Sequence, residues 1–222
     1  MARGVGSRSF RPLDGLSHWV VGFLAARATL ELAAVVGWVL GPVVDGVGLR
    51  AVMRFSAVTG VVEVATVLVF LRWFYLAYGN LDGLGARRSL PRWWAVGAWM
   101  VPVIAWFFPY RMVLESWRLP GAPGGSMDGE GGAGDPRGLA PTPWIFPFWW
   151  GTFLAAHLLG GTGLGVSNPV VFPTPGQALG SSIVTLLTVI SAGLGMQVVR
   201  AVTGVQRDRD LARRGAVRLQ AF

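Results

Sequence analysis

Four ionisable residues lie inside two apolar runs of the sequence, where their types and spacing could do chemistry: Arg27, Glu31, Glu63 and Arg72. Carboxylate and guanidinium groups inside a membrane can relay protons, pass ions or bind an anionic ligand. The same groups can instead form an ion cluster that pairs two helices, with Arg72 extending its charged end to the lipid headgroups. In either case the protein must offset roughly 2.5–3.5 kcal/mol for each charged group at the bilayer centre.

Helix geometry places these four groups at comparable depths. Arg27 and Glu31 are four residues apart and therefore share one helix face. Counted at the helical rise from the cytoplasmic ends of the two runs, Arg27 and Arg72 lie roughly 12 and 9 Å deep, and Glu31 and Glu63 roughly 18 and 22 Å deep. The sequence thus allows a cross-helix pairing of Arg27 with Glu63, or contact of Arg72 with a headgroup.

No other combination of residues predicts an active site. The chain has no Cys, which excludes thiolate catalysis and Cys-based metal sites, and it has only two His, His18 and His157. His157 lies within an apolar run, where a packing role and a catalytic role both remain open. The sequence contains no nucleophile–base arrangement and no glycine-rich phosphate loop after a strand. We therefore expect no catalytic residue, no cofactor and no metal, and predict that the protein is not an enzyme.

The elements that must carry these residues are apolar helices. Of the 222 residues, 53% are hydrophobic and 14% charged, and the mean hydropathy is +0.53, whereas soluble domains average about 25% charged residues. About 20 apolar residues suffice for one helix to cross a bilayer. The prediction is an all-α integral membrane protein with apolar stretches at about 19–43, 55–78, 93–109, 144–161 and 178–200.

The remaining sequence divides the chain into an arm, a membrane domain and a tail. Residues 1–17 are expected to form a loosely ordered cytoplasmic arm, and residues 18–204 a single membrane domain. Within that domain, the Gly- and Pro-rich residues 119–143 predict a flexible linker. Residues 205–222 form a basic tail, expected to be a solvated cytoplasmic helix.

The number of crossings depends on the stretch 93–109. Pro102 interrupts this stretch, and Arg residues flank both of its ends. Five crossings would place the basic tail on the side opposite Arg3, Arg8 and Arg11, which the positive-inside bias opposes. We expect a helical bundle of four transmembrane helices plus one Pro-broken re-entrant or interfacial segment, with five transmembrane helices as the alternative.

The charge distribution indicates the environment of the protein. All 19 basic residues are Arg, the net charge is +8, and the Arg residues cluster at the ends of apolar runs. This pattern is typical of topology signals and of contact with anionic lipid headgroups. The prediction is a multi-pass protein of the cytoplasmic membrane with both termini in the cytoplasm, and no nucleic acid partner.

Small residues mark surfaces where membrane helices can approach each other. The last stretch carries a small-polar stripe, for which packing and a permeation path are the two interpretations: Ser181, Thr185, Thr188, Ala192 and Gly195. Gly37 and Gly41, like Gly161 and Gly165, have the spacing of close helix pairs. Such surfaces predict protein partners or a homo-oligomer within the membrane.

One block of sequence is more distinctive than the rest. It contains Phe70-Leu-Arg-Trp-Phe-Tyr-Leu-Ala-Tyr-Gly-Asn-Leu-Asp-Gly-Leu-Gly85, then Leu90-Pro-Arg-Trp-Trp and, further on, Pro109-Tyr-Arg-Met-Val-Leu-Glu-Ser-Trp117. It resembles the bacterial membrane family called domain of unknown function 4328. The matching positions are Trp73, Asn80, Leu81, Gly85, Pro91, Trp93, Trp94, Trp99, Pro102, Pro109, Tyr110, Glu115 and Trp117. The resemblance implies a multi-span membrane protein without an assigned activity.

Two further expectations concern Asn80 and Pro102 in this block. Asn80 follows the second apolar run and is expected to cap its last carbonyls or the next turn. Pro102 frees a helix carbonyl that needs a partner, for which Asn80 and Arg72 are the candidates in the sequence. The segment is then either a structural elbow or a polar pocket at the cytoplasmic mouth. The family pattern often has a polar residue after the central Pro, and Val103-Ile104-Ala105-Trp106 here weakens the pocket.

Three functions follow from these features. The first is a non-enzymatic assembly or interaction subunit that uses its Arg-rich surfaces and small-residue faces. The second is a transporter or channel component with Arg27, Glu31, Glu63 and Arg72 on its path. The third is an intramembrane enzyme, which would need a second polar cluster near Glu63 or His157.

Overall fold

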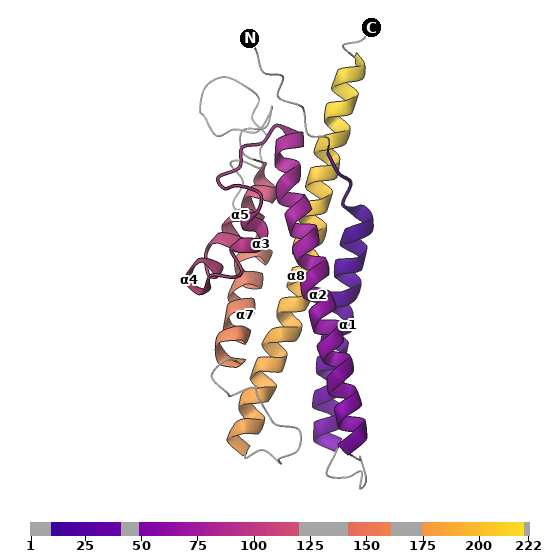
Figure 1. Cartoon of the computed structure of the whole chain (residues 1–222), viewed down its shortest axis with the longest axis vertical. Helices are drawn as coiled ribbons and strands as arrows, with labels where there is room; N and C mark the ends of the chain where they lie inside the picture. Colours follow the sequence, from indigo (N-terminus) through magenta and orange to yellow (C-terminus); the bar gives the residue numbers. More distant parts are fainter. Residues whose placement is uncertain (1–9, 41–48, 120–141, 161–174, 220–222) are drawn as a thin grey trace. The chain divides into compact units, whose positions relative to one another are not determined.

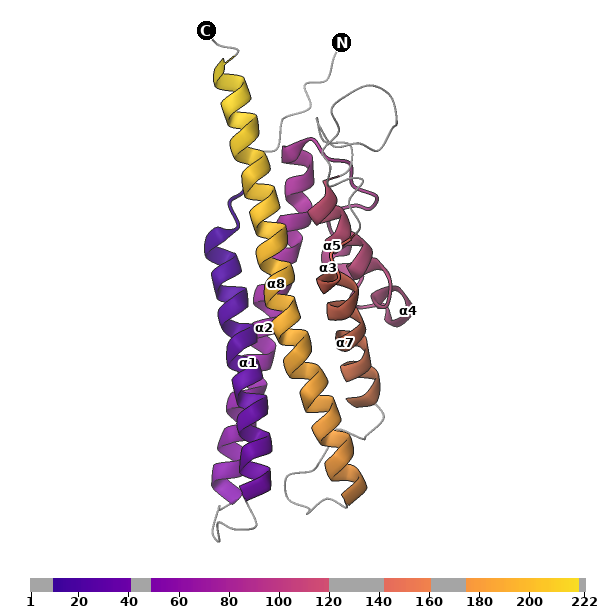
Figure 2. The ribbon, with the colours of Figure 1, turned by 180° about the vertical axis from the view of Figure 1, so that it is seen from behind.

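The computed structural model describes residues 10–40, 49–119, 142–160 and 175–219, and every regular element in these ranges is a helix. The elements are α1 (Asp14–Leu40), α2 (Leu49–Leu84), α3 (Trp94–Gly97), α4 (Pro102–Ala105), α5 (Phe108–Arg118), α7 (Ile145–Leu159) and α8 (Pro175–Leu219), drawn in Figures 1 and 2. The predicted all-α class is confirmed. The predicted linker 119–143 falls almost entirely outside the described residues.

Among the described residues, three helices are long and apolar enough to cross a membrane. These stretches are Asp14–Gly37, Met53–Leu84 and Gly180–Ala216. The fourth apolar helix, α7, has 15 residues and falls short of that length. Three of the five predicted stretches are therefore seen as helices of spanning length.

The stretch 93–109 does not form one continuous helix. It contains α3 and α4, of four residues each, and the start of α5. Pro102 stands at the first turn of α4, and Val101 before it is extended, with φ −109° and ψ 112°. A residue before Pro is disfavoured in the helical region, which explains the break at the predicted position.

Two helices are longer than the sequence predicted. α2 continues past Tyr78 to Leu84, and α8 runs without a break from the apolar stretch into the basic tail. Gly85, with φ 75°, ends α2. The Gly85 amide donates to the Asp82 carbonyl and the Ala86 amide to the Leu81 carbonyl, at 3.2 and 2.8 Å. These two bonds form a Schellman motif, in which only a residue tolerant of the left-handed region fits well at position 85.

The chain forms two compact units. Unit 1 comprises residues 1–18, 70–143 and 199–222, and unit 2 comprises residues 19–69 and 144–198. The buried stripe of α2 organises unit 1: Trp73, Phe74, Ala77, Tyr78, Leu81 and Leu84. This spacing places all six side chains on one helix face. Met112 and Val113 of α5 and Val199 and Val202 of α8 complete the core of unit 1.

Unit 2 has a smaller buried core and a more apolar exterior. Its buried side chains include Val20, Phe146, Trp149, Ala192 and Val198. Large apolar side chains of α2 in this unit are exposed: Val58, Val61, Val64, Val67 and Leu68. An apolar exterior of this kind is suited to contact with lipid chains.

Candidate functional site

Gln206 is the centre of a buried polar network in unit 1. Its side chain is fully buried on α8. The Nε2 atom donates to the carbonyls of Ala77 on α2 and Ser116 on α5, at 3.0 and 3.1 Å. Ser116 lies in the last turn of α5, where carbonyls lack a partner within their own helix. One amide therefore joins three helices and satisfies an otherwise orphaned carbonyl.

Asn80 extends this network to the N-terminal segment. Its Nδ2 donates to Gln206 Oε1 at 3.2 Å and to the Arg11 carbonyl at 2.9 Å, while its Oδ1 accepts from the Arg11 amide at 3.0 Å. The side-chain amide thus binds the backbone of Arg11 on both its donor and its acceptor. These bonds hold Arg11 against α2, and α1 begins at Asp14, so the expectation of a loosely ordered arm throughout 1–17 is wrong for Arg11 and for residues 14–17.

The same contacts correct two expectations about Asn80. Asn80 lies inside α2, four residues before its end, and caps neither that helix nor the next turn. Its amide is committed to Arg11 and Gln206, so it does not serve the carbonyl that Pro102 frees. The proline segment is held by other contacts.

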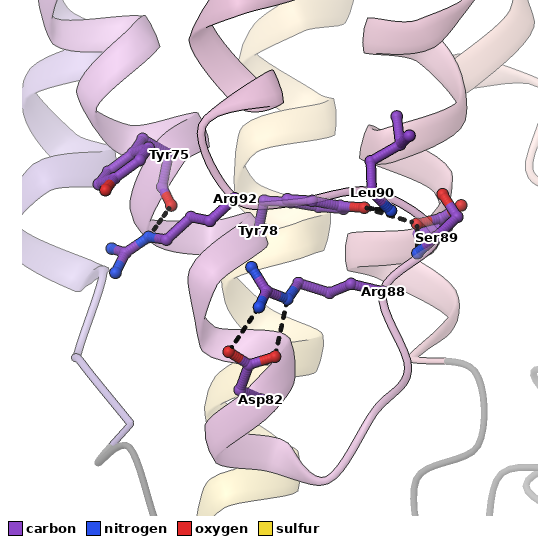
Figure 3. A network of polar contacts seen from close by, with 8 residues as sticks. Tyr75, Tyr78, Asp82, Arg88, Ser89, Leu90 and Arg92 are labelled. Carbon is purple, nitrogen blue, oxygen red and sulfur yellow. Dashed lines mark hydrogen bonds and ion pairs between the residues drawn. The ribbon is translucent and has the colours of Figure 1, made fainter.

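A second set of contacts joins α2, α5 and the loop between α2 and α3. The Tyr78 hydroxyl donates to Glu115 Oε2 and accepts from the Leu90 amide, both at 3.0 Å. The Ser89 amide also donates to Glu115 Oε2, at 3.2 Å, and Arg111 Nε donates to Glu115 Oε1 at 3.2 Å. Figure 3 shows Tyr78 directed toward Leu90 and Ser89. Glu115 is therefore a structural acceptor in this arrangement.

Two arginines of the loop bind back to α2 (Figure 3). Arg88 makes a bidentate ion pair with Asp82, at 2.7 and 2.8 Å. Arg92 Nε donates to the Tyr75 carbonyl at 3.1 Å, and its guanidinium lies 4.0 Å from the centre of the Tyr75 ring. The Arg92 guanidinium also lies against Gly79, where a Cβ atom would collide with it. A glycine at position 79 allows this close approach.

Unit 2 contains three of the four predicted intramembrane charges. Arg27 Nη1 and Glu63 Oε1 form an ion pair at 2.7 Å between α1 and α2, which is the cross-helix pairing that the sequence allowed. Glu31 is half-buried and interacts electrostatically with both residues. Thr59 and Thr66, which share the face of Glu63, donate their hydroxyls to carbonyls of their own helix.

Arg72 differs from the other three charges. It is exposed on α2 and belongs to unit 1. His157 is exposed on α7, with Nδ1 2.8 Å from the Phe153 carbonyl and its ring 4.1 Å from the Phe153 ring. Both contacts are within one helix turn.

The predicted packing stripe of α8 is confirmed at one position. A Cβ atom on Gly195 would lie 3.1 Å from Trp149 Nε1 and 3.7 Å from a methyl group of Leu24. Gly195 therefore lets α1 and α7 approach α8 closely within unit 2. Gly37 has no such neighbour, and Gly41, Gly161 and Gly165 lie outside the described residues.

The residues of the distinctive block have mainly structural positions. Trp73 is fully buried, and its indole nitrogen donates to the Thr203 hydroxyl of α8 at 3.1 Å. Trp94 stacks on Trp93 with ring centres 4.5 Å apart. Pro109 and Trp117 are buried on α5, on which Tyr110 is half-buried, whereas Pro91 and Pro102 are exposed. Sequence reasoning missed Arg11, Thr203 and Gln206, because their partners lie far away in the chain.

The described residues include no group of three or more His, Asp or Glu side chains that could hold a metal ion. The arrangement in unit 1 instead fixes Arg-bearing segments of the chain to one another. Sixteen of the 19 Arg and eight of the 11 acidic residues belong to unit 1, which thus carries a net charge of +8. Unit 2 has three of each and is neutral.

Comparisons with known proteins place this arrangement in a family. Searches of curated proteins and of solved structures found no match. The family described as "Domain of unknown function (DUF4328)" matches residues 40–206, which include α2, the loop arginines, α5 and Gln206 of the buried network. The chain therefore belongs to this family, whose function is unknown.

Proposed function

We propose that this protein is a non-enzymatic interaction subunit of the bacterial cytoplasmic membrane, and that the end of α8 binds an acidic segment of a partner protein. The observation that carries the proposal is the exposure of six consecutive residues, Leu211–Ala216, on a helix anchored by Gln206. Six residues exceed one helical turn. Most of the circumference of the helix is therefore exposed there, and α8 continues beyond the last turn of α2 (Figures 1 and 2).

Charge supports the choice of an acidic partner. The region 205–219 carries five Arg and two Asp residues. Arg207 pairs with Asp14 and Arg214 with Asp210, at 3.4 and 2.7 Å, and Arg213 contacts the Gly83 carbonyl. The Arg207 and Arg213 contacts join this end of α8 to the start of α1 and the last turn of α2, while the net charge of the region stays positive. A prepositioned basic surface favours association with acidic partners by electrostatic steering.

The same proposal includes the orientation of the chain in the membrane and its number of crossings. The Arg-rich segments at both termini and between α2 and α7 all belong to unit 1, so the positive-inside bias favours unit 1 on the cytoplasmic side. The broken stretch 93–109 begins and ends within this unit, which favours four crossings, by the three helices of spanning length and by the shorter apolar helix α7. Ala212→Cys would supply the only thiol. We expect an impermeant maleimide to label it only after cell lysis.

Site-specific photocrosslinking tests the partner. A photoreactive amino acid at Leu211, in the full chain in its native membrane, should give a discrete adduct with one protein that has an acidic segment. The double variant Arg213→Glu/Arg214→Glu should abolish the adduct. The matched control, Arg50→Glu/Arg54→Glu at the start of α2, makes the same change of charge in unit 2 and should keep it. An adduct that survives reversal at 213 and 214 would contradict the proposal.

The Arg27–Glu63 ion pair supports a second candidate function, transport of a proton or ion. The pair lies within the two candidate spanning helices, where ionisable groups often mark a transport path. In proteoliposomes with a pH-sensitive dye, Glu63→Gln should then fold normally and lose proton flux. Thr29→Val is the control, because its hydroxyl only binds the Ala25 carbonyl of its own helix. Equal flux in wild type and Glu63→Gln would reject this function.

A further inference from the structure

Residues 93–107 form an uncharged segment with a strongly apolar exterior. Its two short helices are joined by turns, and its large exposed side chains include Trp93 (58% exposed), Met100 (79%), Val103 (71%) and Phe107 (64%). Burial of such a side chain away from water stabilises a folded protein. In water these four side chains would contribute none of that stabilisation, so this exterior is suited to an apolar cover.

The opposite side of the segment is fixed to α2 within unit 1. Ala95 and Ala98 are buried, and the Trp99 ring lies edge-on to Phe70 and Phe74, at 5.9 and 6.4 Å between ring centres. Arg92 binds the Tyr75 carbonyl at the start of the segment. The exposed apolar side chains therefore project from a segment whose other side is packed against α2.

The backbone of the segment decides how deep it can lie. Hydrogen bonds close the turn after α3, with the Trp99 amide donating to the Val96 carbonyl and the Met100 amide to the Gly97 carbonyl. In α4, Pro102 has no amide hydrogen and the Ala105 amide donates to the Val101 carbonyl at 2.8 Å, whereas the amides of Val103 and Ile104 have no acceptor within this four-residue helix. Such groups need water or headgroup oxygens, which are present at the membrane interface and absent from the hydrocarbon centre.

We propose that residues 93–107 form an interfacial wedge that inserts Trp93, Met100, Val103 and Phe107 among the phospholipid acyl chains of one leaflet and returns without crossing. Three observations favour lipid as the cover. The described part of the chain contains three helices of spanning length, the segment is rich in the aromatic residues that settle at interfaces, and cationic Arg92 and Arg111 flank it. This inference goes beyond the proposed function, because it requires no acidic protein partner.

Depth-dependent quenching tests the wedge. The variant Met100→Cys, labelled with an environment-sensitive fluorophore, is reconstituted as the full chain in vesicles of phosphatidylcholine and phosphatidylglycerol. Nitroxide groups are placed near the headgroup end or at the far end of the acyl chains. We expect blue-shifted emission that is quenched at least twofold more by the shallow nitroxide than by the deep one.

The test has one control variant and three results that would contradict the wedge. Arg87→Cys places the same label on an exposed loop residue of unit 1 and should report water with little quenching. Water-like emission at position 100 would overturn the wedge, as would blue-shifted emission that no lipid nitroxide quenches, since another protein would then be the cover. Stronger quenching by the deep nitroxide would also overturn it and would indicate a crossing segment.

Discussion

The side-chain amides of Asn80 and Gln206 meet across 126 residues of sequence, with Asn80 Nδ2 donating to Gln206 Oε1 at 3.2 Å. Both side chains are at most 3% exposed. In these buried surroundings each amide must find its partners inside the protein. Through this one bond α2 and α8 share a network that reaches Arg11 at one end and the last turn of α5 at the other.

Gln206→Leu should lower the stability of the folded protein more than the same replacement of an exposed Gln. Leucine keeps the volume but removes three hydrogen bonds and leaves the Ser116 carbonyl and part of the Asn80 amide without a partner. Each buried group left unsatisfied costs about 1–3 kcal/mol. The measurement is thermal unfolding in detergent micelles followed by Trp fluorescence. Gln197→Leu, on an exposed position of the same helix, is the control, and equal midpoints for the two variants would contradict the assigned role.

Asn80→Asp should release the backbone of Arg11 from α2, although the side-chain oxygen that accepts from the Arg11 amide is kept. The carboxylate can still accept from the Arg11 amide, but it cannot donate to the Arg11 carbonyl or to Gln206. It would also place a buried charge beside two acceptors, which is unfavourable. Hydrogen exchange at the Arg11 amide should accelerate at least tenfold. The Ser17 amide, bonded to the Leu13 carbonyl within α1, reports whether the helix itself has opened, and unchanged exchange at Arg11 would refute the tether.

The apolar spans could be predicted because length and hydropathy alone decide them. The stretches near 19–43, 55–78 and 178–200 correspond to α1, α2 and α8. Pro102 breaks the stretch 93–109 at the residue before it, as the steric restriction on residues that precede proline predicts. The Arg27–Glu63 pairing was among the sequence predictions because helical rise fixes the depth of both groups. These features depend on local geometry.

The ends of the helices and the buried network depend on distant contacts and were not predictable. The second apolar stretch was predicted to end near residue 78, yet α2 continues to Leu84, and within that extension Asn80 has partners in residues 11 and 206. Gln206 sits between Val205 and Arg207 in a basic tail, and nothing in its neighbourhood marks it as buried. The sequence offered one signal for the buried position of Gln206, the polar residue Thr203, which is three residues earlier and hence on the same helix face as Gln206.

Gly195→Leu should disturb unit 2 through overpacking. Even a Cβ atom there would lie 3.1 Å from Trp149 Nε1, so a leucine must displace the indole or Leu24. Overpacking of this kind costs about 1–3 kcal/mol. The expected result is a lower unfolding midpoint in micelles. Gly193→Leu, two residues earlier with no atom within 4 Å of its added Cβ, should have a much smaller effect. If the two variants unfold alike, Gly195 is not a packing contact.

The ion pair of unit 2 predicts unequal effects for its two partners. Glu63→Gln leaves Arg27 with Glu31, one turn away on the same helix, whereas Arg27→Met leaves two carboxylates facing each other without a cation. An uncompensated charge in the membrane costs about 2.5–3.5 kcal/mol, so Arg27→Met should lose at least that much stability and Glu63→Gln clearly less. Adding Glu63→Gln to Arg27→Met removes one of the two carboxylates and should restore part of the loss.

Folded yield in the membrane and unfolding midpoint in micelles measure all three variants of this set. Coupling of the two positions would appear as a double variant more stable than Arg27→Met alone. Strictly additive losses would mean that the pair contributes nothing beyond its separate residues. A Glu63→Gln variant that keeps its stability while losing proton flux would go further, because it would separate the transport role of this carboxylate from its role in holding α1 to α2.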